Sequence, residues 1–157
     1  MSSQEEGLRP EEFAEAAAAA VADTQGRDFR DAAAVLATSG LFGVCATEES
    51  GGLGLGWPFG VAVCEAAGKL QLHFPLVEQM VLASVFANTD IAEALVSGNK
   101  VATIAWQGSL AEKAVTHVAY AADCDWVLVA DGQGASLLEV ASLALQANET
   151  LDPDYPH

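Results

Sequence analysis

Apolar residues recur with helical spacing through the first part of the chain. Alanine and glutamate fill residues 10–23, with proline in the first turn and acids behind it, which predicts a helix whose start suits the helix dipole. Phe29, Ala32 and Leu36 share one face of a second predicted helix over residues 28–39, which Gly40 is placed to cap. The chain is therefore expected to begin with two helices.

A glycine-rich stretch follows these two helices. Four glycines fall between positions 51 and 56, so residues 47–56 are expected to form an ordered loop without a regular element. After the loop, Pro58 can open a third helix, because Phe59, Val63 and Leu70 then lie on one face.

Two further helices are predicted before position 100. Pro75 opens a helix over residues 76–87 that is apolar nearly all round, which favours a central place in a helical bundle. Thr89 and Asp90 then cap a short helix that ends near Gly98. Residues 1–99 therefore read as all-helical.

The pattern changes after Lys100 to short runs rich in valine, aromatic residues or leucine. These runs lie between glycine, aspartate and asparagine residues, and they predict strands over residues 101–106, 115–120, 126–130 and 137–145. The last run also fits a helix, because Leu138, Ala141 and Leu145 have helical spacing. A helical unit followed by strands indicates an α+β chain.

Composition and charge exclude several classes of function. The 157 residues are 52% apolar and carry a formal net charge of −16, from 22 acids and 6 bases. Such a surface repels nucleic acid and anionic lipid, so local groups must hold any anionic ligand. The amino terminus lacks the basic and apolar regions of a leader, and no apolar run is long enough to span a membrane. Three widely spaced cysteines form no disulfide framework, which favours the cytoplasm.

Several chemically suggestive residues have a structural interpretation. The spacing of the glycines in residues 51–56 does not match a phosphate-binding loop, so a tight turn before a helix is the better interpretation. Glu48, Glu49 and Glu65 are expected to be solvated charges and not an acid–base pair. The histidines, at positions 73, 117 and 157, lack a second ligand at metal-binding spacing, so no metal site is predicted.

Two motifs give the chain a resemblance to a known family. Residues 41–44 read LFGV, residues 48–56 read EESGGLGLG, and residues 63–68 in the following helix read VCEAAG. This order is similar to the amino-terminal domain of acyl-CoA dehydrogenases. The resemblance continues through residues 75–87, SGNK at 97–100 and the strand at 101–106, and it extends to LDP at 151–153. It implies an amino-terminal helical domain over residues 1–99 and a partial antiparallel middle β-domain over residues 100–157.

The chain departs from the family where the family contacts its flavin. The family continues the first β-domain strand into a Thr-Glu-Pro motif, whereas this chain has AWQGS at residues 105–109. By analogy, Trp106, Gln107 and Ser109 occupy the region that contacts FAD. The indole of Trp106 either stacks on the flavin ring or fills its place. The family's catalytic glutamate belongs to a carboxyl-terminal helical domain that these 157 residues do not reach, so no catalytic residue is expected here.

The resemblance implies a subunit or fragment of an FAD-dependent acyl-CoA dehydrogenase. The family's reaction removes a proton alpha to the thioester and a hydride from the beta carbon of a fatty or steroid side-chain acyl-CoA. This chain resembles the degenerate partner in heteromeric bacterial enzymes, which implies a full-length dehydrogenase subunit as its partner. Met80 and Ser84 border the acyl pocket by analogy, although such residues on an apolar helix also serve as core. The alternative is a non-catalytic accessory subunit that stabilises its partner and binds no flavin.

Overall fold

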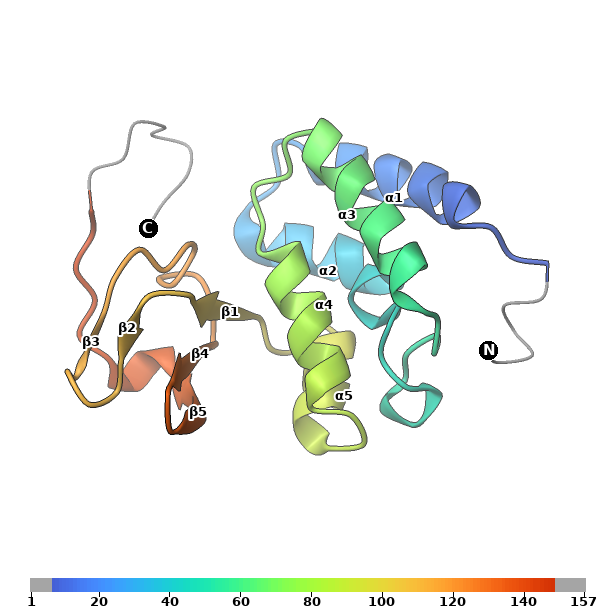
Figure 1. The fold of residues 1–157 in the computed structure, drawn as a ribbon. Coiled ribbons are helices and arrows are strands. Elements are labelled where there is room, and N and C mark those ends of the chain that lie inside the picture. Colours follow the sequence, from blue (N-terminus) through green and yellow to red (C-terminus); the bar gives the residue numbers. More distant parts are fainter. Residues whose placement is uncertain (1–6, 149–157) are drawn as a thin grey trace. The chain divides into compact units, whose positions relative to one another are not determined.

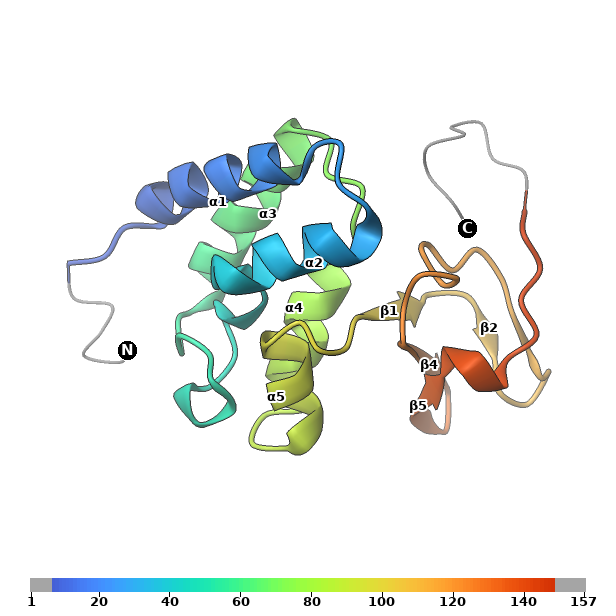
Figure 2. The same ribbon diagram turned by 180° about the vertical axis from the view of Figure 1, so that it is seen from behind.

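The computed structural model describes residues 7–148 of the chain. The chain divides into two compact units, one up to Asn99 and one from Lys100 onward. The first unit is helical and the second contains the strands, as Figures 1 and 2 show from opposite sides. The LDP stretch at residues 151–153 and the histidine at position 157 lie outside the described residues.

The helical unit has the helices that the sequence predicts. Between its second and third α-helices lie two short 3₁₀-helical turns, one over Leu41–Gly43 and one over Glu48–Ser50. The α-helices are α1 (Pro10–Thr24), α2 (Phe29–Thr38), α3 (Trp57–Lys69), α4 (Leu76–Val85) and α5 (Asp90–Val96).

Local signals determine where these helices begin. Pro10 occupies the first turn of α1, where a missing backbone N–H costs no hydrogen bond. The Asp28 side chain accepts a hydrogen bond of 2.9 Å from the backbone N–H of Asp31 and so caps α2. The Thr89 hydroxyl accepts one of 3.4 Å from the backbone N–H of Ala92 at the start of α5. The cap predicted at Thr89 is confirmed, and the structure adds the cap at Asp28.

Aromatic stacking joins distant segments in the helical core. Phe42 is fully buried, and its ring stacks on that of Phe74 with the centroids 5.4 Å apart. Phe29 at the start of α2 stacks on Phe74 at 4.8 Å. Gln79 of α4 is also fully buried, and its amide donates to the Leu95 carbonyl at 2.9 Å, which ties α4 to α5. The core therefore combines apolar packing with a satisfied polar group.

The glycine-rich loop is ordered, as predicted, but its Glu48–Ser50 part forms a 3₁₀-helical turn where no regular element was expected. The backbone N–H groups of Leu53 and Gly54 donate to the carbonyls of Gly43 and Ala46, both at 2.8 Å. A Cβ atom on Gly52 would lie 2.3 Å from the Ala46 carbonyl oxygen, so only glycine fits this approach. The loop is thus pinned to the segment that precedes it, which supports the structural interpretation of its glycines.

The expectation that α4 is central to the bundle is wrong for the helical unit. One side of α4 packs on α5 and on the 3₁₀-helical turn at Leu41–Gly43. Val77 is about half exposed and Val85 is 68% exposed on another side of the helix. An apolar pattern on all sides therefore does not mean that every side is covered by this chain.

The second unit contains a mixed sheet and a small hairpin. Its strands are β1 (Ala102–Ala105), β2 (Gly108–Ser109), β3 (Ala114–Val115), β4 (Trp126–Asp131) and β5 (Gly134–Glu139). The order of the first sheet is β1-β4-β5, and β2 pairs with β3 in a separate antiparallel ribbon. The predicted α+β class is confirmed, and β4 and β5 are antiparallel, but β1 runs parallel to β4.

Two predicted strands have different bounds in the structure. The strand expected over residues 115–120 stops at Val115, because His117 and Tyr120 have positive φ values that an extended strand excludes. The run expected over residues 137–145 is instead β5, which starts earlier and ends at Glu139, followed by a 3₁₀-helical turn over Val140–Ser142. Glu139 pairs with Trp126, the first residue of β4. Beyond this pair the Val140 N–H still donates to the Asp125 carbonyl at 2.9 Å, and the chain then turns away in the 3₁₀-helical turn.

Candidate functional site

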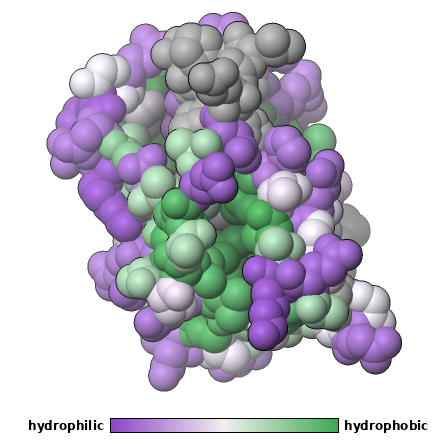
Figure 3. All heavy atoms as spheres, turned by 90° about the vertical axis from the view of Figure 1, so that its left-hand side faces the viewer, coloured by the Kyte–Doolittle hydropathy of each residue, from purple (hydrophilic) through white to green (hydrophobic). Residues whose placement is uncertain are grey.

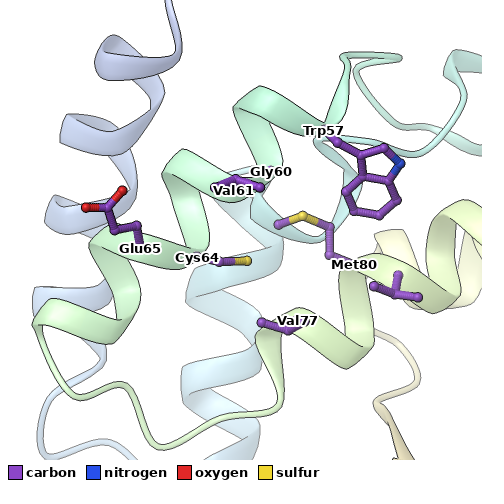
Figure 4. A pocket seen from close by; sticks show the side chains of 8 residues that line it. Trp57, Gly60, Val61, Cys64, Glu65, Val77 and Met80 are labelled. Carbon is purple, nitrogen blue, oxygen red and sulfur yellow. The ribbon is translucent and has the colours of Figure 1, made fainter.

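An apolar groove of about 450 Å³ runs between α3 and α4 in the helical unit (Figure 4). Trp57 and Glu65 lie toward opposite ends of the part of α3 that lines it, and the Met80 side chain reaches from α4 toward α3. The lining residues are mostly apolar: Trp57, Gly60, Val61, Cys64, Glu65, Val77, Met80 and Val81.

The groove exists because its two helices pack mainly on other partners. α3 packs along α1, while α4 packs on α5 and the Leu41–Gly43 turn. α3 and α4 approach each other closely at Gly60, where an added Cβ atom would lie 3.0 Å from the Met80 sulfur. It would also lie 2.8 Å from the sulfur of Cys45, which sits behind this contact. The absence of a side chain at Gly60 therefore sets how closely the helices approach.

The walls of the groove are exposed although they are apolar. Val61 is 62% exposed, and Trp57 and Val77 are each about half exposed. Val77, Val81 and Val85 follow one another at four-residue spacing, which places them along one stripe of α4. Clustered exposed apolar side chains of this kind mark binding surfaces more often than scattered ones do.

Charge at the groove comes from α3 and α4. The Glu65 carboxylate pairs with the Lys69 ammonium at 2.9 Å, and this hydrogen bond lowers the pKa of Glu65. Desolvation, with smaller contributions from Cys45 and Glu78, raises the pKa of the Cys64 thiol to about 11. Cys64 is therefore a neutral thiol at physiological pH and is not activated as a nucleophile.

The two residues assigned to an acyl pocket by analogy occupy different positions. Met80 lies in the floor of the groove and is only 1% exposed, since its side chain is held between α3 and α4. Ser84, one turn further along α4, is half-buried and does not line the groove. Their role beside an acyl chain stays a prediction.

Sequence reasoning did not identify most of the groove. Trp57, Val61, Cys64 and Val77 were not proposed as site residues. The signal in the sequence was the valine repeat on α4, which includes Val77 and fits both a buried core and an unpartnered face. Only packing between the helices distinguishes these two cases.

The residues assigned to the flavin region lie together in the second unit. Trp106 follows β1 directly, and its indole is 68% exposed, with Gln107 exposed beside it. Ser109 ends β2, and its hydroxyl accepts a hydrogen bond of 3.2 Å from the backbone N–H of Glu112. An exposed indole beside a strand end offers a flat surface for stacking, while the Ser109 hydroxyl is already engaged within its turn.

The remaining candidate residues are not brought into one site. Glu48 and Glu49 are exposed, and Glu65 is paired with Lys69 on its own helix. His73 and His117 are both exposed and belong to different units. Among the described side chains, which are those of residues 7–130 and 132–148, no three from histidine, cysteine, aspartate or glutamate gather in a way that could hold a metal ion. In the same range, no helix has both the length and the apolar character needed to cross a bilayer.

The surface reflects the unusual composition of the chain. On the face drawn in Figure 3, polar side chains surround an apolar patch. This arrangement is expected for a chain with 22 acids whose residues are nevertheless 52% apolar.

Comparison with solved structures shows what this fold resembles. The chain aligns over 88% of its length with a chain of the ChsE4-ChsE5 complex from Mycobacterium tuberculosis, at 21% identity and a TM-score of 0.68. The FAD complex of PigA aligns over 99% of the chain, at 17% identity and a TM-score of 0.68. The Tcur3481-Tcur3483 steroid ACAD aligns over 94%, at 15% identity and a TM-score of 0.54.

The likeness extends over most of this chain but not over the whole of these proteins. The chain spans about half the length of the solved chains, 49%, 54% and 48% respectively. No protein-family model and no curated protein sequence matches it. The comparisons confirm the predicted α+β fold, which is of the acyl-CoA dehydrogenase-like type.

Proposed function

We propose that this chain is a subunit or part of an FAD-dependent acyl-CoA dehydrogenase, active only together with a further polypeptide segment or partner subunit. The enzyme would dehydrogenate an acyl-CoA thioester between its alpha and beta carbons, with a fatty or steroid side-chain acyl group. Bound FAD would supply the acceptor for the hydride. This chain would contribute helical wall and part of the β-domain, and the base would come from its partner.

One observation carries the proposal: nearly the whole chain matches about half of each of several flavoprotein-like structures. The PigA structure is described as an FAD complex, and two of the other matches are described by a pair of protein names. A half-length match across both units is consistent with a chain that needs another half to complete a site. The partner that would complete it is proposed to be a full-length dehydrogenase subunit.

In the second unit, Trp106 is the residue best suited to contact a flavin. The exposed indole of Trp106 can stack on a flat ring, and the exposed Gln107 beside it carries an amide that can donate or accept a hydrogen bond. The engaged hydroxyl of Ser109 fits such a role less well. Trp106 and Gln107 would therefore hold FAD only together with groups from the partner.

Purification with and without the natural partner tests this function. Chain isolated by itself should show little flavin absorbance in the visible spectrum and no reduction of an acceptor dye with acyl-CoA. The complex isolated from the native source should be yellow and should reduce the dye when acyl-CoA is added. A colourless, inactive complex would refute the dehydrogenase assignment, and a yellow, active isolated chain would refute the need for a partner.

The replaced motif at residues 105–109 favours a second candidate, an accessory subunit that stabilises the dehydrogenase without binding flavin. Trp106→Ala distinguishes the two roles, because the exposed indole can be removed with little loss of packing. If this chain holds FAD, the variant complex should keep its subunits and lose flavin. If the Trp106→Ala complex contains as much flavin as the unmodified complex, at one FAD for each pair of this chain and its partner, the accessory role is favoured.

A further inference from the structure

The apolar stripes on α3 and α4 form a surface of defined shape. Trp57 and Val61 on α3 stand on one wall of the groove and Val77 on α4 stands on the other (Figure 4), and Val81 of α4 also lines it. Residues four positions apart lie one above the other on a helix, so each wall is a ridge about one side chain wide. A groove between two such ridges has the form that receives the apolar face of a third helix.

The depth of the groove favours a helix over a small ligand. Its floor is filled by Met80, which is 1% exposed and reaches the Gly60 contact between the helices. Small-molecule pockets bury most of the ligand surface. An acyl chain lying here would keep one side in water, because Val61 and Val77 project outward on either side. A packed helix would instead cover both ridges.

The charge of the chain favours a basic partner over a second copy. Each chain carries a formal charge of −16, so two copies repel each other on approach. Glu65 lines the groove, and Glu78 lies close enough to act electrostatically on Cys64 in its wall. Lysine or arginine residues beside the apolar ridge of an incoming helix would meet these acids, and at Glu65 they would share the carboxylate with Lys69, which pairs with it at 2.9 Å. Complementary charge of this kind speeds association and selects the partner.

We propose that the α3/α4 groove binds an amphipathic helix of the partner subunit. The apolar ridge of that helix would lie between Trp57 and Val77, and its basic residues would face Glu65 and Glu78. This inference rests on the proposed function in one respect, that the chain assembles with a second polypeptide. It adds the surface at which assembly occurs and the chemistry of the segment that is recognised.

Two synthetic helical peptides test the groove on the full chain. Both carry leucine at i, i+4 and i+7, and they differ only in having lysine or glutamate on the flanks. Trp57 lies in the groove, so its fluorescence should change on binding, and the Trp57→Phe variant identifies the signal that comes from Trp57. The chain should bind the lysine peptide about tenfold more tightly than the glutamate peptide, and added salt should reduce the difference.

Surface variants supply the matched control. Val61→Lys and Val77→Lys place charge on both ridges at exposed positions, so circular dichroism should show an unchanged fold. The double variant should bind the lysine peptide at least about tenfold more weakly. Leu53→Lys alters an exposed leucine outside the groove lining and should bind like the unmodified chain.

Four outcomes would overturn the inference. In the first, the folded chain fails to bind the lysine peptide, and in the second, the double variant binds this peptide as tightly as the unmodified chain does. In the third, the unmodified chain forms a dimer that the double substitution dissociates. In the fourth, an acyl-CoA binds saturably and displaces the peptide. None of these measurements needs flavin or turnover. Peptide binding by a chain whose native complex lacks dehydrogenase activity would therefore refute the proposed reaction and leave the docking surface standing.

Discussion

Replacing Gly60 with alanine adds one methyl group where α3 and α4 touch. The new Cβ atom would lie 2.8 Å from the Cys45 sulfur and 3.0 Å from the Met80 sulfur, both inside van der Waals contact. Overpacking of this kind costs about 1–3 kcal/mol. The change from glycine to alanine within a helix returns up to about 1 kcal/mol. The net effect is expected to be destabilising unless the two sulfur atoms move aside.

Gly68→Ala is the matched control for this substitution. Gly68 lies on the same helix, and a Cβ atom there would have no atom within 4 Å apart from its own helix and neighbours. The control should therefore show only the gain in helix propensity. The free energy of unfolding of Gly60→Ala should fall below that of Gly68→Ala by about 1–3 kcal/mol.

Urea denaturation followed by circular dichroism at the helical band measures both variants, because the signal comes chiefly from the helical unit. Adding Cys45→Ala to Gly60→Ala removes the nearer sulfur and should recover part of the loss, which a double-mutant cycle reports as coupling. Equal stabilisation by Gly60→Ala and Gly68→Ala would refute the reasoning that this glycine sets the spacing of the helices.

Four further predictions concern the helical unit. Iodoacetamide should modify Cys64 slowly at pH 8, with the rate rising about tenfold per pH unit toward its pKa of about 11, as peptide mass spectrometry can follow. Because the folded pKa of Cys64 lies above the unfolded value, its contribution to stability should be present below pH 9 and should be lost between pH 9 and about 11, unlike in Cys64→Ala. Asp28→Ala should cost about 1 kcal/mol of unfolding free energy through loss of the α2 cap, whereas Asp28→Asn should retain most of it. Phe42→Ala should cost about 3–5 kcal/mol, against less for Phe42→Leu, and an unchanged melting curve would contradict the stacked core.

The helices of the first unit were largely predictable because their signals are local. Proline at the first turn of α1, Asp28 before α2 and Thr89 before α5 act within three or four residues of themselves. The loop at the glycines, residues 51–56, was predictable for the same reason, since so many glycines disfavour a regular element, whereas the 3₁₀-helical turn at Glu48–Ser50 was not predicted. These signals do not depend on what the rest of the chain does.

The second unit was less predictable because strand bounds depend on pairing. Residues 115–120 have a strand-like composition, yet His117 and Tyr120 have positive φ and turn the backbone. The end of β5 at Glu139 is set by its alignment with the first residue of β4. The parallel direction of β1 against β4 follows from the path of the intervening chain and not from either strand alone.

The sequence by itself determined the helical unit, the change to strands after Lys100, the acidic charge and the resemblance that pointed to the fold. Tertiary structure alone decided that α4 has an uncovered side and that Trp57, Val61 and Val77 border a groove. The physical reason is that helix formation follows from neighbours along the chain, whereas the burial of a helix face follows from segments far away in sequence. The valines of α4 have the same pattern whether they meet the core of this chain or the surface of a partner.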